Sequence, residues 1–82
     1  MEPNGWKALG EYYANQEDWE NARGPLERAL ELAPKNPGIL ELLGRTESGQ
    51  GNDIQALALL EQALELAPDN AQILFSMGRV HH

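Results

Sequence analysis

The stretch from Glu27 to Arg45, ERALELAPKNPGILELLGR, decides the fold because it returns almost unchanged later in the chain. Residues 61–79 read EQALELAPDNAQILFSMGR, and 12 of the 19 positions are identical at a fixed offset of 34 residues. The hexapeptide Ala-Leu-Glu-Leu-Ala-Pro occurs complete in both copies. A fixed period of this length is typical of proteins in which one supersecondary unit is stacked several times.

Apolar residues in both copies recur every three to four positions, which indicates helices rather than strands. The run Leu57-Ala58-Leu59-Leu60 could be taken for a short strand, but it lacks β-branched residues and its flanks continue the helical spacing. We therefore expect helices at about 3–16, 18–33, 37–50 and 53–67, and a fifth helix from about 71 to the end of the chain.

Asparagine and aspartate stand where the helices are expected to begin. Asn36 and Asn70 precede the third and fifth helices, and side chains of this type can accept hydrogen bonds from the first-turn N–H groups. Asp18 and Asn52 are the matching candidate caps of the second and fourth helices. Each of the last four helices thus has a candidate capping residue.

Prolines and glycines mark the places where helices should end or be disturbed. Pro34 and Pro68 have no backbone N–H and are expected to stop the second and fourth helices. The run Gly49-Gln50-Gly51 is the expected turn after the third helix, since glycine tolerates positive φ. Because Gly24-Pro25 falls inside the second helix, we expect a bend or irregular turn near residues 21–25.

Small residues recur where the axes of paired helices should approach each other most closely. In the two copies these residues are Gly10, Ala22, Ala29, Gly44, Ala56 and Ala63. Larger apolar residues surround them and are expected to interdigitate into a core, where each well-buried leucine stabilises the fold by roughly 1.5–3 kcal/mol relative to exposure.

The same residues follow a known repeat pattern. The first copy carries W-x2-L-G-x2-Y and then A-x3-L, at Trp6, Leu9, Gly10, Tyr13, Ala22 and Leu26. In the second copy the equivalent positions are Leu40, Leu43, Gly44, Glu47, Ala56 and Leu60. Together with the 34-residue period, these residues mean that the chain resembles the tetratricopeptide-repeat family.

The resemblance implies an all-α solenoid, in which two helix-turn-helix hairpins and a fifth helix stack as a right-handed superhelix. Repeat one would span residues 3–36 and repeat two residues 37–70, with a partial third repeat or capping helix at 71–82. These units would form a single domain of residues 1–82, which we expect to be a fragment of a longer array.

The resemblance also implies a non-enzymatic scaffold that binds a peptide or partner protein in a concave groove, lined by the first helix of each pair. Carried over to this sequence, the groove residues are Lys7, Glu11, Glu41, Leu42, Arg45, Phe75 and Arg79. Some members of the family clamp the C-terminal carboxylate of a peptide with five polar residues. Only Lys7 matches that set, because Glu11, Leu42, Gln72 and Ser76 occupy the other places, which argues against such a clamp here.

The fifth helix suggests an alternative function, namely a structural assembly module. It carries an apolar set that a single neighbouring helix cannot cover, made of Ile73, Leu74, Phe75, Met77 and Val80. Uncovered apolar surface on a small protein marks an interaction site. We therefore expect self-association into a homo-oligomer through this helix as the alternative to peptide binding.

Composition excludes several other partners. The chain of 82 residues has 13 acidic and 6 basic residues, a net charge of −7 and a pI near 4.6. Such a chain repels phosphates, so we expect neither nucleic-acid binding nor direct membrane contact. We expect a cytoplasmic location, with the periplasm as the alternative.

No residues point to catalysis, a metal or a cofactor. The chain has no cysteine, so disulfides and thiolate zinc sites are excluded. Its two histidines, His81 and His82, are adjacent and would project about 100° apart from a helix, which makes a poor chelate. They are expected to be a tag remnant or an ordinary tail, and we expect the protein not to be an enzyme.

Overall fold

The structure is a computed structural model that describes residues 3–81. In this range the chain forms five α-helices and no strand: α1 (Pro3–Asn15), α2 (Trp19–Leu32), α3 (Pro37–Gly49), α4 (Asp53–Leu66) and α5 (Ala71–His81). The predicted all-α fold is confirmed, and each predicted helix is present within one or two residues of its expected bounds.

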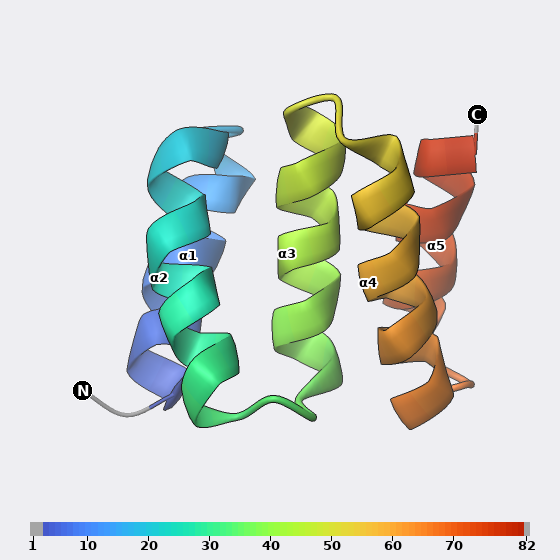
Figure 1. The fold of residues 1–82 in the computed structure, drawn as a ribbon, viewed down its shortest axis with the longest axis horizontal. Coiled ribbons are helices and arrows are strands. Elements are labelled where there is room, and N and C mark those ends of the chain that lie inside the picture. Colours follow the sequence, from blue (N-terminus) through green and yellow to red (C-terminus); the bar gives the residue numbers. More distant parts are fainter. Residues whose placement is uncertain (1–2, 82) are drawn as a thin grey trace.

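The helices stack as two hairpins and a terminal helix (Figure 1). Helix α1 packs on α2, and α3 packs on α4, while α3 also contacts α1, α2 and α5. In the view of Figure 1, α2, α3 and α4 lie across the front, with α1 behind α2 and α5 behind α4. Helix α3 is therefore the central element against which all the others are placed.

Small residues lie at the helix crossings, as the sequence predicts. A Cβ atom added to Gly44 would lie 2.7 Å from Cγ of Leu60, and one added to Gly10 would clash with Leu26 in the same way. The four repeat alanines, Ala22, Ala29, Ala56 and Ala63, are all 0% exposed. The hairpins therefore form because a glycine on one helix lets the leucine of the next lie directly against its backbone.

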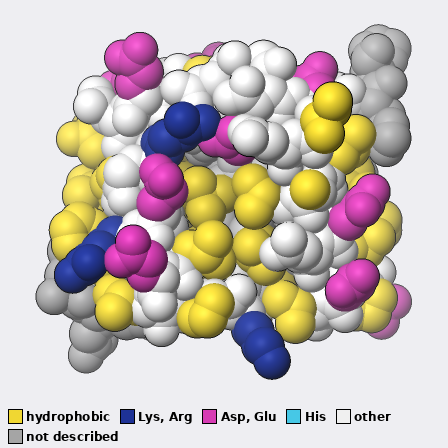
Figure 2. Space-filling model, viewed as in Figure 1, with side chains coloured by type: hydrophobic (Ala, Val, Ile, Leu, Met, Phe, Trp, Pro, Cys, Tyr) yellow, Lys and Arg dark blue, Asp and Glu magenta, His cyan; other side chains and the backbone are white. Residues whose placement is uncertain are grey.

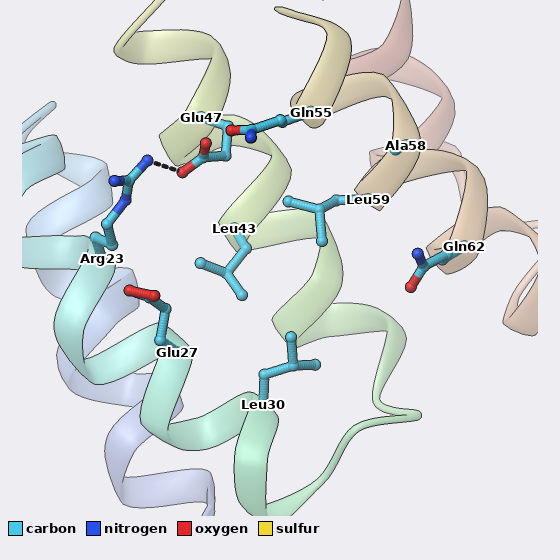
Figure 3. A pocket seen from close by; sticks show the side chains of 9 residues that line it. All are labelled: Arg23, Glu27, Leu30, Leu43, Glu47, Gln55, Ala58, Leu59 and Gln62. Carbon is cyan, nitrogen blue, oxygen red and sulfur yellow. Dashed lines mark hydrogen bonds and ion pairs between the residues drawn. The ribbon is translucent and has the colours of Figure 1, made fainter. Parts of the chain in front are cut away.

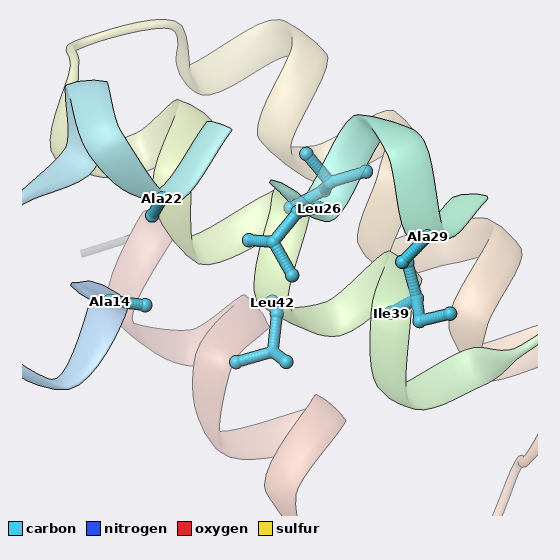
Figure 4. Packing of buried hydrophobic residues seen from close by; sticks show 7 residues of the cluster. Ala14, Ala22, Leu26, Ala29, Ile39 and Leu42 are labelled. Atoms are coloured by element: carbon cyan, nitrogen blue, oxygen red, sulfur yellow. The ribbon is translucent and has the colours of Figure 1, made fainter. Parts of the chain in front are cut away.

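Two apolar clusters make up the core. The first joins α1, α2 and α3 and contains Ala14, Ala22, Leu26, Ala29, Ile39, Leu42 and Leu43 (Figure 4). The second joins α3, α4 and α5 and contains Leu40, Leu60, Ala63 and Ile73. Since α3 contributes to both clusters, burial of its apolar residues couples the two hairpins.

Two of the four predicted helix caps are made by side chains. The Oδ1 atom of Asn36 accepts hydrogen bonds from the backbone N–H groups of Gly38 and Ile39, at 2.9 and 3.2 Å. Asn70 makes the same pair of bonds at the start of α5, with Gln72 and Ile73. These two predictions are confirmed, and the two caps fix the points at which α3 and α5 begin.

The predicted side-chain caps at Asp18 and Asn52 are wrong, although both residues occupy the N-cap position. The carboxylate of Asp18 instead accepts a hydrogen bond from Nδ2 of Asn21, at 2.8 Å. Asn52 donates through Nδ2 to the carboxylate of Glu47, at 3.3 Å. The carboxylate of Asp18 is thus engaged by a neighbouring donor, and the amide of Asn52 is held by Glu47 of the preceding helix rather than by its own helix.

Helix α2 continues through Pro25 without the irregular turn that we expected. Two local features reduce the cost of this proline. The residue before it is Gly24, which lacks the Cβ atom that would clash with the proline ring in a helical conformation. Asn21, whose carbonyl would have accepted the missing N–H, is exposed, so water can reach this turn of the helix.

The turns inside the two hairpins both contain a residue with a positive φ, but the residue differs. Gly51 has a φ of +86°, as the sequence predicts for the α3–α4 turn. Glu17, which precedes Gly51 by 34 residues, has a φ of +58° in the α1–α2 turn. Left-handed backbone is unfavourable for residues with a Cβ atom, so the first turn is locally strained where the second is not.

We expect Gly44→Ala to lower the free energy of unfolding by about 1–3 kcal/mol, because the new methyl group must displace Leu60 or separate the helices. The control is Gly78→Ala on α5, where a Cβ atom would meet nothing within 4 Å and no proline follows. Alanine is the better helix former, so the control should gain up to about 1 kcal/mol. Urea denaturation measures both, and a gain in stability for Gly44→Ala would contradict the assigned contact.

Candidate functional site

A recess of about 320 Å³ lies between the first helices of the stack, α1, α3 and α5. Helix α1 supplies one wall, α3 the floor and the start of α5 the other wall. The lining residues are Lys7, Glu11, Asn15, Gly38, Glu41, Leu42, Arg45, Asn70 and Gln72. We call this recess, together with the adjoining one described next, the α1–α3–α5 groove.

The adjoining recess has a volume of about 230 Å³ and a more cationic lining. Arg45 of α3 and Arg79 of α5 both line it, and Glu17 is its one acidic residue. The other lining residues are Trp19, Ser48, Gly49, Ser76 and Val80. These arginines are 34 residues apart, and the repeat brings them to the same side of the molecule. Arg45 lines both recesses and therefore connects them into one surface.

The structure brings together most of the predicted groove residues. Lys7, Glu11, Glu41, Leu42 and Arg45 line the first recess, and Arg79 lines the second. Phe75 lines neither, and it is 65% exposed on α5. Leu42 is only 2% exposed, because its side chain belongs to the first core cluster. The groove is consequently more polar than the sequence alone suggested.

Glu41 is the buried acidic group at the floor of the groove, with an exposed fraction of 5%. Its Oε2 atom accepts a hydrogen bond from the hydroxyl of Ser76, at 2.8 Å, which ties α3 to α5. Nε of Arg45 lies 3.8 Å from the same oxygen. Burial raises the pKa of Glu41 above its usual value, and the Ser76 hydrogen bond and Arg45 only partly oppose this effect.

Lys7 reaches from α1 across to the start of α3. A Cβ atom added to Gly38 would lie 2.8 Å from Nζ of Lys7, so the glycine leaves the space that the lysine occupies. The ammonium group therefore sits at one end of the groove, with Arg45 and Arg79 toward the other. Cations at both ends are separated by the exposed Glu11 and the buried Glu41.

A second hollow, which sequence reasoning missed, lies on the opposite side of α3 (Figure 2). It is a cleft of about 450 Å³ between α2, α3 and α4. Leu30, Leu43 and Leu59, one from each helix, point into it, and the ion pair between Arg23 and Glu47 closes one end (Figure 3). The sequence pattern gave no sign of this cleft, because Leu30, Leu43 and Leu59 have the spacing of core residues and were expected to be buried.

The apolar set predicted for self-association is divided by the structure. Ile73 is 0% exposed and lies in the second core cluster, and Met77 and Val80 pack against that cluster. Leu74 and Phe75 are 51% and 65% exposed. The accessible part of the set is therefore these two neighbours on α5.

The sequence profile described as tetratricopeptide repeat matches residues 3–69, which include both hairpins. The chain belongs to the tetratricopeptide-repeat family. Tetratricopeptide repeats generally mediate protein–protein interactions, and the family is in general a non-enzymatic scaffold. No curated protein matches the chain.

Within residues 3–81, no three histidine, cysteine or acidic side chains are grouped so that they could hold a metal ion. His82 and the side chain of His81 lie outside the described part of the chain. None of the helices described here is both long and apolar enough to span a membrane.

We expect Glu41→Gln to make the stability of this repeat domain less sensitive to pH. The pKa of Glu41 is raised in the folded state, so the folded chain holds the proton more tightly than the unfolded chain. The stability from this group is present below the unfolded pKa and is lost as the pH rises through the folded pKa. Glutamine avoids that loss and can still accept the Ser76 hydrogen bond.

Urea denaturation at several pH values checks this expectation. The variant should be more stable than the unmodified chain at pH 7, and the difference should shrink on acidification toward pH 4. Glu11→Gln is the control, because Glu11 lies in the same groove but is exposed. A difference between Glu41→Gln and the unmodified chain that does not vary with pH would contradict the role given to burial.

Proposed function

We propose that this tetratricopeptide-repeat domain binds a peptide segment of a partner protein in the α1–α3–α5 groove. The observation that carries the proposal is that Arg45 belongs to both recesses and lies beside Arg79 in the second. The groove is formed by three successive repeat positions, so an extended ligand can contact all three helices at once.

The charge pattern favours a peptide with acidic side chains toward the α5 end of the groove. Among the described residues, Arg79 takes part in none of the three ion pairs, so a ligand carboxylate has an available partner. Arg45 is held near Glu41, and its side chain is 19% exposed. Arginine suits this role because its guanidinium can bind a carboxylate through two hydrogen bonds.

The peptide is expected to contribute few large apolar side chains to the floor of the groove. Leu42, which the sequence offered as an apolar contact, is covered by the core. Phe75 remains available at the edge of α5, where it can pack against an apolar side chain of the ligand. The proposed ligand is therefore acidic, with one apolar residue near Phe75.

Self-association through α5 is the second candidate function, favoured by the exposure of Leu74 and Phe75. Adjacent exposed apolar side chains on a terminal helix offer a surface that a second copy of the chain can cover. The patch is small, so association through it alone should be weak, since stable interfaces usually bury more than about 1,000 Å².

We expect Arg45→Gln combined with Arg79→Gln to weaken peptide binding about tenfold or more. A charge-assisted hydrogen bond contributes roughly 1.5–3 kcal/mol, so loss of two such contacts is readily measured. Peptides are first selected from a random library on the unmodified chain, and their affinities are then compared by calorimetry. Glutamine is used because an acidic replacement would place a second carboxylate beside Glu41.

Arg28→Gln is the matched control for this comparison. Arg28 lies on the exposed surface of α2 and pairs with Glu31 at 3.1 Å, away from the groove. Its loss should leave peptide affinity unchanged. Selected peptides that bind the double variant as tightly as the unmodified chain would remove the two arginines from the proposed site.

We expect the mass measured by light scattering to rise above 9.1 kDa at high micromolar concentration if α5 drives assembly. Leu74→Ser combined with Phe75→Ser should restore the monomer mass, because both side chains are exposed and are not needed by the core. A strictly monomeric unmodified chain at these concentrations would eliminate the second candidate and leave the peptide groove unaffected.

A further inference from the structure

The cleft between α2, α3 and α4 is formed by helices of the two complete hairpins, so it does not depend on what precedes α1 or follows α5. Both α2 and α4 pack on α3, while no Cα atom of α2 lies within 8 Å of one in α4. The second helices of the two hairpins therefore leave a space over α3. Its volume of about 450 Å³ is within the range of roughly 300–1,000 Å³ that is usual for ligand sites.

Leucines form the floor of this cleft and remain partly accessible. Leu43 of α3 is 4% exposed, and Leu30 and Leu59 are half-buried. Both Leu30 and Leu59 pack against the two core clusters, yet each keeps part of its surface in the cleft. Ala58, which also lines the cleft, is exposed and takes up little of its space. An apolar side chain of a ligand can therefore leave water against three leucines.

A polar network fixes one end of the cleft. The guanidinium of Arg23 pairs with the carboxylate of Glu47, which also accepts a hydrogen bond from Nδ2 of Asn52, at 3.3 Å. Arg23 belongs to α2 and Glu47 to α3, and Asn52 is the N-cap residue of α4. The network thus joins the three helices around the cleft and sets its width before a ligand binds, which lowers the cost of binding. It also neutralises Arg23.

The walls of the cleft are acidic. Helices α2 and α4 together carry six acidic residues and two arginines, and both arginines are held in ion pairs with glutamates of the chain. Figure 2 shows acidic side chains over both helices, on either side of the apolar ones between them. Glu27 lines the cleft, is exposed and, among residues 3–81, takes part in no ion pair. The cleft therefore favours a cationic ligand and repels a second copy of this chain, whose net charge is −7.

Two glutamines of α4 favour an extended ligand over a helical one. Gln55 and Gln62 are exposed and line the cleft from the α4 side (Figure 3). Each side-chain amide offers two donors and an acceptor. An extended segment has unpaired backbone N–H and C=O groups that can bond to these amides, whereas a helix pairs its own. The two glutamines are about 10 Å apart along the helix axis, which is the length of about three extended residues.

We propose that this cleft binds an extended segment of a partner protein, with leucine-sized side chains at positions i and i+2 and a lysine or arginine next to them. Side chains at i and i+2 of an extended segment point to the same side, so both reach the leucine floor. The cation pairs with Glu27, and the two glutamines hold the backbone. The site takes the opposite charge to the ligand proposed for the α1–α3–α5 groove and lies on the other side of α3.

A synthetic peptide, Lys-Leu-Ser-Leu-Lys with blocked ends, serves as the probe. It is titrated into the 15N-labelled 82-residue chain, and amide shifts are followed by NMR. Saturable shifts are expected at Leu30, Leu43, Leu59 and their neighbours rather than in α1 and α5. The peptide Glu-Leu-Ser-Leu-Glu lacks the cations and Lys-Ser-Ser-Ser-Lys lacks the apolar side chains, and each should bind about tenfold more weakly or less.

Ala58→Leu separates binding from stability. The larger side chain fills part of the cleft and should weaken binding of the lysine peptide about tenfold or more, because it excludes one leucine of the ligand. Alanine and leucine are both strong helix formers and Ala58 is exposed, so the melting temperature should not fall.

Glu27→Gln tests the charge. It should weaken binding of the lysine peptide about two- to fivefold, as loss of an exposed ion pair does, and should make the affinity less sensitive to salt. Asp69→Asn is the matched control, because it removes the same charge from the exposed turn before α5. This control should leave the affinity unchanged.

Three results would overturn the proposal. One is undiminished affinity of the Ala58→Leu chain for the lysine peptide. Another is equal affinity for the lysine and the glutamate peptides. The third is a titration in which no residue of the cleft shows saturable shifts at millimolar peptide, whether or not residues of α1 and α5 respond. Arg45→Gln combined with Arg79→Gln should leave binding in the cleft intact, so this proposal and the peptide groove fail separately.

Discussion

The close approach of helix backbones at Gly10 and Gly44 is the contact on which the rest of the molecule depends. A leucine of the next helix lies where a Cβ atom would otherwise be, so glycine is what lets the two helices of each hairpin approach this closely. Burial of the alanines follows from that short distance, and the two core clusters follow from the alanines. Because α3 belongs to both clusters, it positions α1 and α5 on either side and so creates the groove.

One residue of the groove, Glu41, is both a lining residue and a buried carboxylate that links two helices. Burial of Glu41 raises its pKa. The Oε2 atom of the same residue accepts the hydrogen bond from Ser76 that joins α5 to α3. Burial of a carboxylate costs free energy unless partners compensate for lost hydration. Here Ser76 and Arg45 compensate in part, and the same arrangement holds Arg45 at the junction of the two recesses.

The sequence predicted the parts of the fold that depend on repetition, namely the five helices, the small residues and the caps at Asn36 and Asn70. It failed where a side chain had a competing neighbour, as at Asp18 and Asn52. It also could not show that Gly24 makes a helical Pro25 tolerable, because that depends on the clash that the missing Cβ avoids. In the candidate site, periodicity placed the predicted residues on one face of the stack but did not give their depth. Leu42 was therefore taken as accessible, and the cleft floored by Leu43 was missed.

Glu17 occupies the left-handed turn position that Gly51 fills in the second hairpin. The same first hairpin also contains Pro25, which removes one hydrogen bond from α2. In repeat proteins, stability is approximately a sum over units and the contacts between them. Local unfolding should therefore begin at the amino-terminal hairpin, whose amide protons would exchange with solvent before those of α3 and α4. A backbone preference in one turn thus makes the first of two similar hairpins less stable against local unfolding than the second.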